Sequence, residues 1–180
     1  LTDIQLPAQI AAISNGMFYN CSALTEMEIP AGITGIGSYA FQNCTGLTNV
    51  VIGDGLTAIG NYAFQTCTGL TAVTFGENLK TIGYYAFCQC SSLQSLVLPS
   101  GLEAIGDYAF YMCDAIESMV LPANFNVELD ALTAVLNMIE NLKSITVEDG
   151  GTRYASVGGM LTDDSKSTIL YCPKNYAGPV

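Results

Sequence analysis

The chain repeats one stretch, Leu24-Thr-Glu-Met-Glu-Ile-Pro-Ala-Gly-Ile-Thr-Gly-Ile-Gly-Ser-Tyr-Ala-Phe-Gln-Asn-Cys44. Its apolar pattern returns every 23 residues between Leu1 and Ala115, with no insertion or deletion. The five coils begin at Leu1, Leu24, Leu47, Leu70 and Leu93. A fixed period of this length is typical of a solenoid, in which each repeat packs only against its neighbours. We therefore expect the length of the chain to set the number of coils.

Each coil is predicted to begin with a short strand. Positions one, four and six of the coil are apolar, which is the alternation of a strand that buries one face. Position seven is proline or glycine, which ends the strand. A second apolar pair then crosses the far side of the coil, and an Ala-Phe pair fills the interior. The glycine after the second pair, as at Gly37 and Gly60, is expected either to allow close backbone approach or to adopt a positive φ.

The sixth unit, residues 116–141, departs from this pattern. It keeps the strand but replaces the Ile-Gly-x-x-Ala-Phe segment with apolar residues at helical spacing. These residues are Leu129, Leu132, Val135, Leu136 and Ile139. We expect a helix whose start is capped by Asn126 or Asp130.

The last segment, residues 142–180, is predicted to close the array. Leu142, Ile145 and Val147 indicate a seventh strand. Two later runs, Val157 to Thr162 and Thr168 to Cys172, indicate a hairpin that would shield the last strand edge. We therefore expect one domain over residues 1–180, made of regular coils (1–115), a helical repeat (116–141) and a strand with its capping hairpin (142–180).

Charge is concentrated in the coils. Residues 1–141 contain 12 acidic side chains and one basic side chain, Lys80, whereas residues 142–180 contain four of each kind. Such a surface repels phosphate and anionic lipid, so we expect neither nucleic-acid binding nor electrostatic membrane docking. Proline, glycine and polar residues punctuate the uncharged stretch from Ile29 to Gly53, which is therefore not expected to insert into a membrane.

Residue types suited to catalysis or metal binding are scarce. The sequence has no histidine, which removes the commonest general base. Five cysteines share one repeat position and are expected to form a buried, reduced and inert ladder. Cys90 belongs to this ladder and Cys88 is expected to point elsewhere, and neither a CxxC motif nor a histidine completes a zinc site. Asp3, Glu26 and Glu28 are predicted to be neighbours in a solvated acidic patch, because too few oxygens are present for calcium. We expect no enzyme activity, no metal and no cofactor.

The coil resembles the BspA-type, or Treponema-type, leucine-rich repeat. Ile-Gly-x-x-Ala-Phe-x-x-Cys-x-x-Leu carries the resemblance, which is close from Leu1 to Ile116 and looser in the last two units. The runs Tyr154 to Leu161 and Thr168 to Pro173 are similar to the hairpin that often interrupts or ends such arrays. The resemblance implies a leucine-rich-repeat solenoid of the right-handed β/α superhelix class. It also implies a secreted or surface-exposed protein, bacterial in most cases, from arrays associated with adhesion to host proteins.

We interpret the chain as a non-catalytic interaction or adhesion module, expected to be extracellular and monomeric, that binds a protein ligand such as a host or extracellular-matrix protein. Two alternatives stay open: a structural spacer within a larger surface protein, or an accessory domain of an extracellular enzyme. The predicted binding surface is the concave face, where strand positions two, three and five point away from the core, and the predicted contacts occupy positions two and five. Its residues are Thr25, Glu28, Thr48, Val51, Thr71, Thr74, Gln94, Val97 and Val120. A rival surface is the convex row of Tyr39, Tyr62, Tyr85 and Tyr108, because tyrosine is a common interface anchor.

Overall fold

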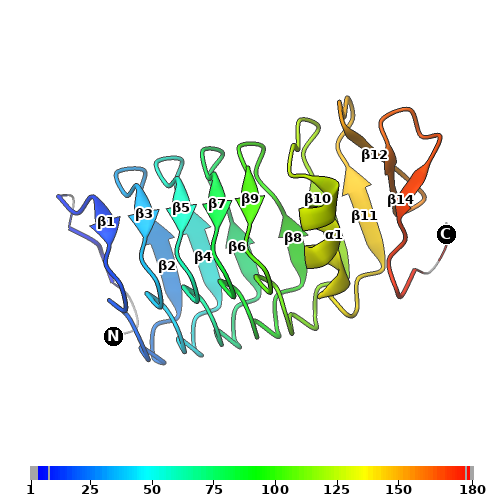
Figure 1. Ribbon diagram of the computed structural model, residues 1–180. Helices are drawn as coiled ribbons and strands as arrows, with labels where there is room; N and C mark the ends of the chain where they lie inside the picture. The colour runs from blue at the N-terminus through cyan, green and yellow to red at the C-terminus, as the bar shows by residue number, and fades with distance from the viewer. Residues whose placement is uncertain (1–3, 8, 177, 179–180) are drawn as a thin grey trace.

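The computed structural model describes residues 4–7, 9–176 and 178. It is a stack of coils that runs from one end of the molecule to the other (Figure 1). The second to fifth coils each contribute one strand to the rear of the stack in this view and one short strand to the front, and α1 (Leu129–Asn137), the one helix among the described residues, lies at the front near the C-terminal end. The predicted solenoid is therefore confirmed.

The longer strands form two parallel sheets on one side of the stack. The first sheet contains β2 (Glu26–Ile29), β4 (Asn49–Ile52) and β6 (Ala72–Thr74). The second contains β8 (Ser95–Val97), β10 (Ser118–Leu121) and β11 (Ser144–Val147). Glu26 pairs with Asn49 and Asn49 with Ala72, so the register equals the sequence period. In the first coil, the described residues Ile4 to Pro7 form no strand, and the rest of its predicted strand lies outside the described residues.

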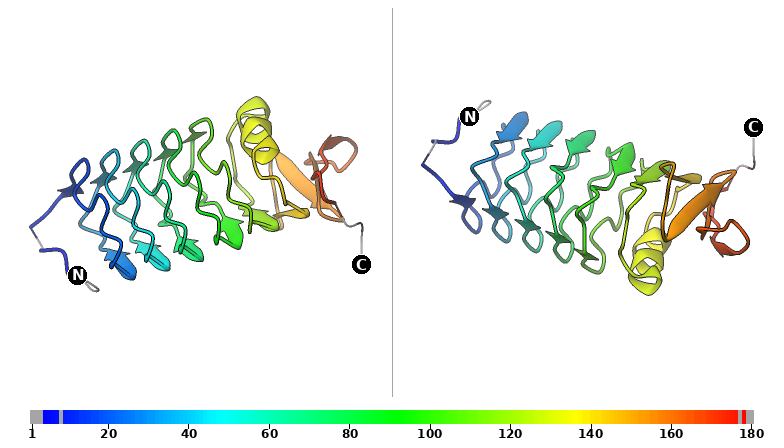
Figure 2. Two further views of the ribbon diagram at one scale, coloured as in Figure 1. Left: turned by 90° about the horizontal axis from the view of Figure 1, so that it is seen from below. Right: turned by 90° about the horizontal axis from the view of Figure 1, so that it is seen from above.

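A third parallel sheet, which the sequence analysis did not predict, lies on the opposite side. It contains β1 (Ala12–Ile13), β3 (Gly35–Ile36), β5 (Ala58–Ile59), β7 (Thr81–Ile82) and β9 (Ala104–Ile105). These are the apolar pairs expected to cross the far side of the coil. Each strand has only two residues, too short for alternation to be distinguishable from a loop. Figure 2 shows the two rows of strands along the length of the stack.

Stacked identical side chains fill the space between the sheets. Phe18, Phe41, Phe64, Phe87 and Phe110 form a ladder of stacked rings with centroids 4.9–5.4 Å apart. Beside the rings, the four buried thiols at the repeated cysteine position each donate a hydrogen bond to a phenylalanine carbonyl of the preceding coil. Cys44 Sγ lies 3.1 Å from the Phe18 oxygen, and Cys67, Cys90 and Cys113 repeat this contact. The repeated phenylalanines therefore supply the aromatic packing of the core, and their carbonyls accept the hydrogen bonds of the repeated cysteines.

The glycines after the second strand permit close approach rather than a positive φ. A Cβ on Gly60 would lie 2.6 Å from the carbonyl carbon of Gly37 in the preceding coil. The left-handed conformation is instead adopted two residues later, at Tyr39, Tyr62, Tyr85 and Tyr108, with φ between 53° and 61°. In the first coil Gly16 occupies this position with φ 62°. Tyrosine rarely adopts this backbone region, so composition gave no sign of it.

The predicted helix is present as α1 (Leu129–Asn137), but its predicted cap is wrong. The N-cap residue is Glu128, which makes no side-chain cap hydrogen bond. Asp130 lies inside the first turn, and the Asn126 side chain accepts a hydrogen bond from Arg153 at 3.0 Å. Leu132, Val135 and Leu136 are the buried residues of the helix. Packing of its apolar face, and not a cap, therefore positions α1.

The C-terminal hairpin is present with an additional strand. The predicted run from Val157 to Thr162 is interrupted, because Gly158 and Gly159 adopt φ of 59° and 91° and turn the chain. The result is an antiparallel sheet of β12 (Tyr154–Val157), β13 (Met160–Asp163) and β14 (Ile169–Tyr171). A two-residue Gly-Gly connection favours such a hairpin turn. Treating the run as one strand was the error.

This sheet covers the last strand of the array. The amide of Ile145 in β11 donates to the Gly159 carbonyl at 2.9 Å, and the amide of Val147 donates to Ser156 Oγ at 3.0 Å. The backbone donors of β11 that point away from β10 therefore have partners. The predicted shielding of the last strand edge agrees with these contacts.

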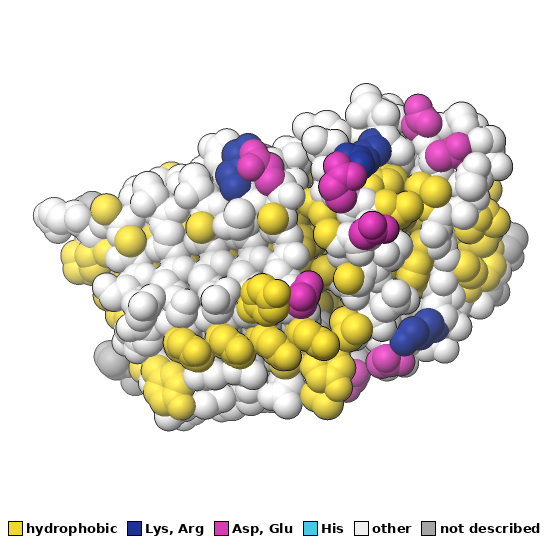
Figure 3. Space-filling view, viewed as in Figure 1, with side chains coloured by type: hydrophobic (Ala, Val, Ile, Leu, Met, Phe, Trp, Pro, Cys, Tyr) yellow, Lys and Arg dark blue, Asp and Glu magenta, His cyan; other side chains and the backbone are white. Residues whose placement is uncertain are grey.

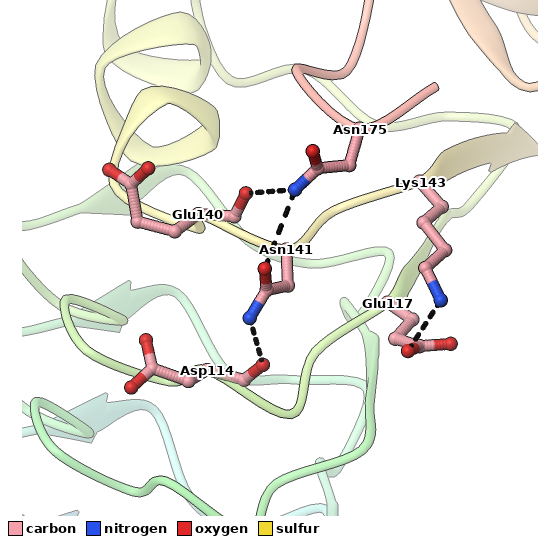
Figure 4. A network of polar contacts seen from close by, with 6 residues as sticks. All are labelled: Asp114, Glu117, Glu140, Asn141, Lys143 and Asn175. Atoms are coloured by element: carbon pink, nitrogen blue, oxygen red, sulfur yellow. Dashed lines mark hydrogen bonds and ion pairs between the residues drawn. The ribbon is translucent and has the colours of Figure 1, made fainter. Parts of the chain in front are cut away.

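Polar side chains hold the cap in place (Figure 4). The Asn175 side chain donates to the Glu140 carbonyl at 2.8 Å and to Asn141 Oδ1 at 3.4 Å. Asn141 in turn donates to the Asp114 carbonyl at 2.8 Å. Lys143 pairs with Glu117 at 2.6 Å, Lys174 with Glu140 at 3.0 Å, and Arg153 with Glu128. Basic residues after position 141 thus pair with acidic residues before it.

Candidate protein-interaction surfaces

The outward-facing side chains of the strands form the predicted binding surface, which we call the strand face. Within β2 and β4, Met27, Ile29, Val50 and Ile52 are buried, and the alternate positions point outward. All nine predicted site residues lie on the strand face. Thr25, Glu28, Thr48, Val51, Thr71, Thr74, Gln94 and Val97 are exposed, and Val120 is half-buried. Val51 is 39% exposed and Val97 is 53% exposed, so the strand face includes apolar surface.

Threonines form an ordered row along one border of the strand face. The Thr48 hydroxyl donates to the Thr25 carbonyl at 2.9 Å, and the Thr71 hydroxyl donates to the Thr48 carbonyl at 2.9 Å. These two hydroxyls therefore bond the backbone of the preceding coil, which holds their side chains in a fixed orientation. Glu26 and Glu28 are exposed beside it, while Asp3, the third member of the predicted acidic patch, lies outside the described residues. No group of three His, Cys, Asp or Glu residues suited to a metal ion occurs in the described part of the chain.

The strand face is not the single plane that the repeat predicts. β6 and β8 belong to different sheets, although their coils remain paired on the opposite side through β7 and β9. On the strand face, the Gln94 amide donates a hydrogen bond to the Thr71 carbonyl at 3.3 Å, just before the two strands begin. Beyond that bond the two strands separate. The core residue Val73 of β6 is consequently only partly buried, whereas its equivalents Val50 and Leu96 are fully buried.

Phe75 is the residue that distinguishes the coil at the break. Position six of the other strands carries leucine, isoleucine or valine, and Phe75 is the sole aromatic residue there. Its ring meets Phe87 of the interior ladder edge-on, with centroids 5.7 Å apart and planes at 88°. Pro99 also lacks the amide that would pair with the preceding coil. Proline alone does not explain the break, because Pro122 follows β10, which pairs with β8.

An apolar groove follows from the break. It has a volume of about 300 Å³ and is lined by Val73, Thr74, Phe75, Glu77, Val97, Leu98 and Pro99. Two of the predicted site residues, Thr74 and Val97, thus lie on opposite walls of one groove. The strand pattern predicts that both residues are exposed but not that a groove separates them. The unusual phenylalanine at position six was the signal available for it.

The rival surface is the tyrosine ladder, formed by Tyr39, Tyr62, Tyr85 and Tyr108. Consecutive rings stack with centroids 4.9–5.2 Å apart and planes within 12°. Figure 3 shows a row of hydrophobic side chains along the corresponding part of the front face. Because the rings stack face to face, they cover one another and present mainly their edges. This agrees with the interpretation that stacked tyrosines in neighbouring coils stabilise the array.

The buried thiols of Cys44, Cys88 and Cys90 remain protonated at neutral pH because burial raises their pKa. Burial raises the pKa of Cys44 to about 12 and the pKa of Cys90 well above its ordinary value. Cys88 is buried as well, although it lies outside the main hydrophobic cluster, and desolvation raises its pKa. A protonated thiol is a poor nucleophile, so these side chains are unsuited to covalent catalysis.

The repeats match a known protein family. The model of the BspA type leucine rich repeat region matches residues 1–117 and 34–154, in six copies. This chain belongs to the BspA-type leucine-rich repeat family. A search of curated proteins finds no match. Among the described residues, no helix combines the length and the apolar character needed to cross a membrane.

Solved structures of bacterial leucine-rich repeat proteins share the fold. The leucine-rich repeat protein of T. pallidum is 29% identical with a TM-score of 0.66, and the match covers 79% of this chain and 69% of that one. A leucine-rich repeat protein from Eubacterium ventriosum is 27% identical with a TM-score of 0.68, covering 87% and 40%. A leucine rich cell surface protein from Faecalibacterium prausnitzii, 23% identical with a TM-score of 0.53, covers 96% and 53% and shows the fold alone. The chain thus spans less than half of the E. ventriosum protein.

Proposed function

We propose that this chain is a non-catalytic module of a bacterial cell-surface protein and binds a protein ligand through its strand face. Membership of the BspA-type family and the cell-surface description of the F. prausnitzii neighbour support a location outside the cell. The observation that carries the choice of face is the apolar surface at Val51, Val97 and the groove beside β6. Exposed valines on a sheet have no role in folding, and apolar patches within a polar border mark interaction sites.

The strand face is suited to a protein rather than to a small molecule. Its apolar positions are distributed over several coils, and the groove between β6 and β8 opens at their centre. The proposed ligand contacts are Thr25, Glu28, Thr48, Val51, Thr71, Thr74, Gln94, Val97 and Val120. The hydrogen-bonded hydroxyls of Thr48 and Thr71 lower the entropic cost of binding, because these side chains are ordered before the ligand arrives.

The test is binding to immobilised extracellular-matrix proteins, measured by surface plasmon resonance. Fibronectin, fibrinogen and collagen serve as the panel, and the chain is expected to bind at least one of them. Val51→Glu combined with Val97→Glu places two charges on the apolar surface and is expected to weaken that binding at least tenfold, since an unpaired interfacial charge costs several kcal/mol, of order 2 or more.

Two control variants locate the binding surface. Thr81→Glu combined with Ala12→Glu adds the same charge on the opposite sheet and is expected to leave binding unchanged, because both positions are exposed there. Tyr62→Asn combined with Tyr85→Asn removes two rings, with a residue that tolerates a positive φ. Loss of binding in the tyrosine variant alone, at unchanged circular dichroism, would place the site on the ladder. Absence of binding to the whole panel would instead favour a structural spacer.

We also propose that residues 1–180 form one monomeric domain. Contacts between the cap and residues 114–141 join the divergent units to the regular coils. Thermal unfolding should give one transition by far-UV circular dichroism and by tyrosine fluorescence at the same midpoint. Light scattering after size-exclusion chromatography should give the mass of a single chain.

A further inference from the structure

The tyrosine ladder ends at a recess beside α1. One face of the Tyr108 ring is covered by Tyr85, 4.9 Å away, while its other face points toward the next unit, where α1 replaces the usual turn. The recess there has a volume of about 210 Å³ and is lined by Asp107, Tyr108, Ala134 and Met138. Tyr111 contacts Tyr108 edge-on at 5.9 Å but does not line the recess. The regular ladder therefore stops at a position where one further planar group would fit.

The recess combines a flat aromatic face with a carboxylate. Tyr108 is 40% exposed. Asp107 Oδ2 accepts a hydrogen bond from the Tyr84 hydroxyl at 3.0 Å, which raises the pKa of Tyr84. The other carboxylate oxygen, Oδ1, has no hydrogen-bond partner among the described residues. It is thus free to accept from an incoming donor.

The charge of the surrounding coils favours a cation. Residues 1–141 carry 12 acidic side chains, and their one basic side chain, Lys80, already pairs with Glu103 at 2.9 Å. Three of the four basic residues after position 141, Lys143, Arg153 and Lys174, pair with Glu117, Glu128 and Glu140, and none of these ion pairs involves Asp107. Attraction of a positive group to Asp107 is therefore not opposed by a neighbouring cation of the chain.

We propose that this recess binds the guanidinium group of an arginine side chain on a partner protein. The guanidinium is planar, so it can stack on Tyr108 as the next member of the ladder, and it carries N–H donors that can bond Asp107 Oδ1. A lysine ammonium offers the charge without the plane, and a phenyl ring offers the plane without the donors. The proposal does not depend on the strand face, which lies on another side of the coil.

Methyl NMR of the six methionines provides the test. Protein labelled with ¹³C-methyl methionine is titrated at low salt with N-acetyl-arginine amide. Met138 lines the recess, so its methyl signal is expected to shift in a saturable manner. The exposed Met17 and Met112 and the buried Met27 and Met119 should not shift. N-acetyl-lysine amide and N-acetyl-phenylalanine amide should bind more weakly, with a larger Kd from the concentration dependence of the Met138 shift.

Three variants separate the proposed contacts from general effects. Asp107→Asn should weaken binding of the arginine probe by about two- to fivefold, the range of an exposed charged contact. Ala134→Leu should fill the recess and abolish the Met138 response. Glu26→Gln makes the same change in net charge on β2 and should have no effect. Unchanged signals of Met27 and Met119 establish that each variant is folded.

Three results would overturn the proposal. The first is an absence of saturable shift at Met138, and the second is an equal affinity for the lysine or phenylalanine probe. The third is an affinity that Asp107→Asn and Glu26→Gln reduce equally, because that would reflect net charge and not the recess.

Discussion

At the scale of single residues, a cysteine and a tyrosine that recur in neighbouring coils stabilise the stack. Cys44, Cys67, Cys90 and Cys113 each donate to a phenylalanine carbonyl of the preceding coil, and the ladder tyrosines adopt a left-handed backbone and stack on one another. In both cases an unfavourable feature, a buried thiol or a positive φ, is stabilised by a repeated residue of a neighbouring coil.

Thiol accessibility should divide the seven cysteines into two groups. Cys44, Cys67, Cys88, Cys90 and Cys113 are buried, Cys21 is intermediate and Cys172 is exposed, and all seven are free. Iodoacetamide at pH 8 should therefore modify Cys172 rapidly and Cys21 slowly in the native protein, with the remaining five modified only after denaturation. Peptide mass spectrometry identifies the sites. Rapid native modification of Cys67 would contradict the buried ladder.

Stability should fall in alkaline solution. Burial raises the pKa of Cys44 from 9.0 to about 12, so between these values the unfolded chain releases a proton that the folded chain retains. The folded state then binds more protons, and the free energy of unfolding decreases as pH rises through this window. The melting temperature should be constant near pH 7–8 and decline from about pH 9. Cys44→Ser removes this thiol and should make the decline shallower.

Substitution of Tyr62 should distinguish ring stacking from backbone strain. Tyr62→Ala removes two stacked contacts, each worth about 0.5–1.5 kcal/mol, while leaving a Cβ in the left-handed conformation. Tyr62→Gly removes the same contacts but relieves a backbone cost of about 1 kcal/mol. Urea unfolding should therefore show the glycine variant to be more stable than the alanine variant. The opposite order would mean that the turn is not held at a positive φ in solution.

At the scale of the element, the break between β6 and β8 is the main departure from the repeat. Phe75→Leu restores the residue type of the other coils at position six, and we predict that it closes the groove. Amide exchange measures this, because the edge amides of β8 should become as protected as those of β4, which is paired on both sides. Pro99→Gly, which restores only the missing donor, serves as the comparison. Unchanged exchange in Phe75→Leu would show that this ring does not cause the break.

At the scale of the whole molecule, the cap should keep the array monomeric. Deleting residues 153–180 removes Gly159 and Ser156, the partners of the β11 amides, and exposes an apolar end. An exposed strand edge is a template for pairing with another chain, so light scattering should show self-association. Arg153→Gln removes the contacts of Arg153 with Glu128, Asn126 and the Tyr154 ring but keeps the hairpin, and should stay monomeric. A monomeric deletion variant with an unchanged melting temperature would show that the hairpin is an appendage.

The local pattern of the chain was sufficient to predict the solenoid, the buried ladders and the outward positions of the strand face. Strand alternation and a constant period depend on neighbouring residues alone, and Leu, Phe and Cys recur at the same positions in every coil. The helix was predictable for the same reason, since Leu132, Val135 and Leu136 are spaced for one face. Val51 and Val97 were recognised as exposed because each lies beside a buried neighbour in its strand.

Only the tertiary structure decided features that depend on contacts between coils. The two-residue strands of the third sheet exist because each coil pairs with the next, and Tyr39 or Tyr62 adopts a positive φ because stacking offsets its cost. The groove beside Phe75 and the recess beside Tyr108 arise where one coil differs in shape from its neighbour. A repeat sequence specifies the strands and core positions that all coils share. Cavities form where the side chains of adjacent coils differ and do not pack closely. Such differences in packing depend on the three-dimensional arrangement of the coils.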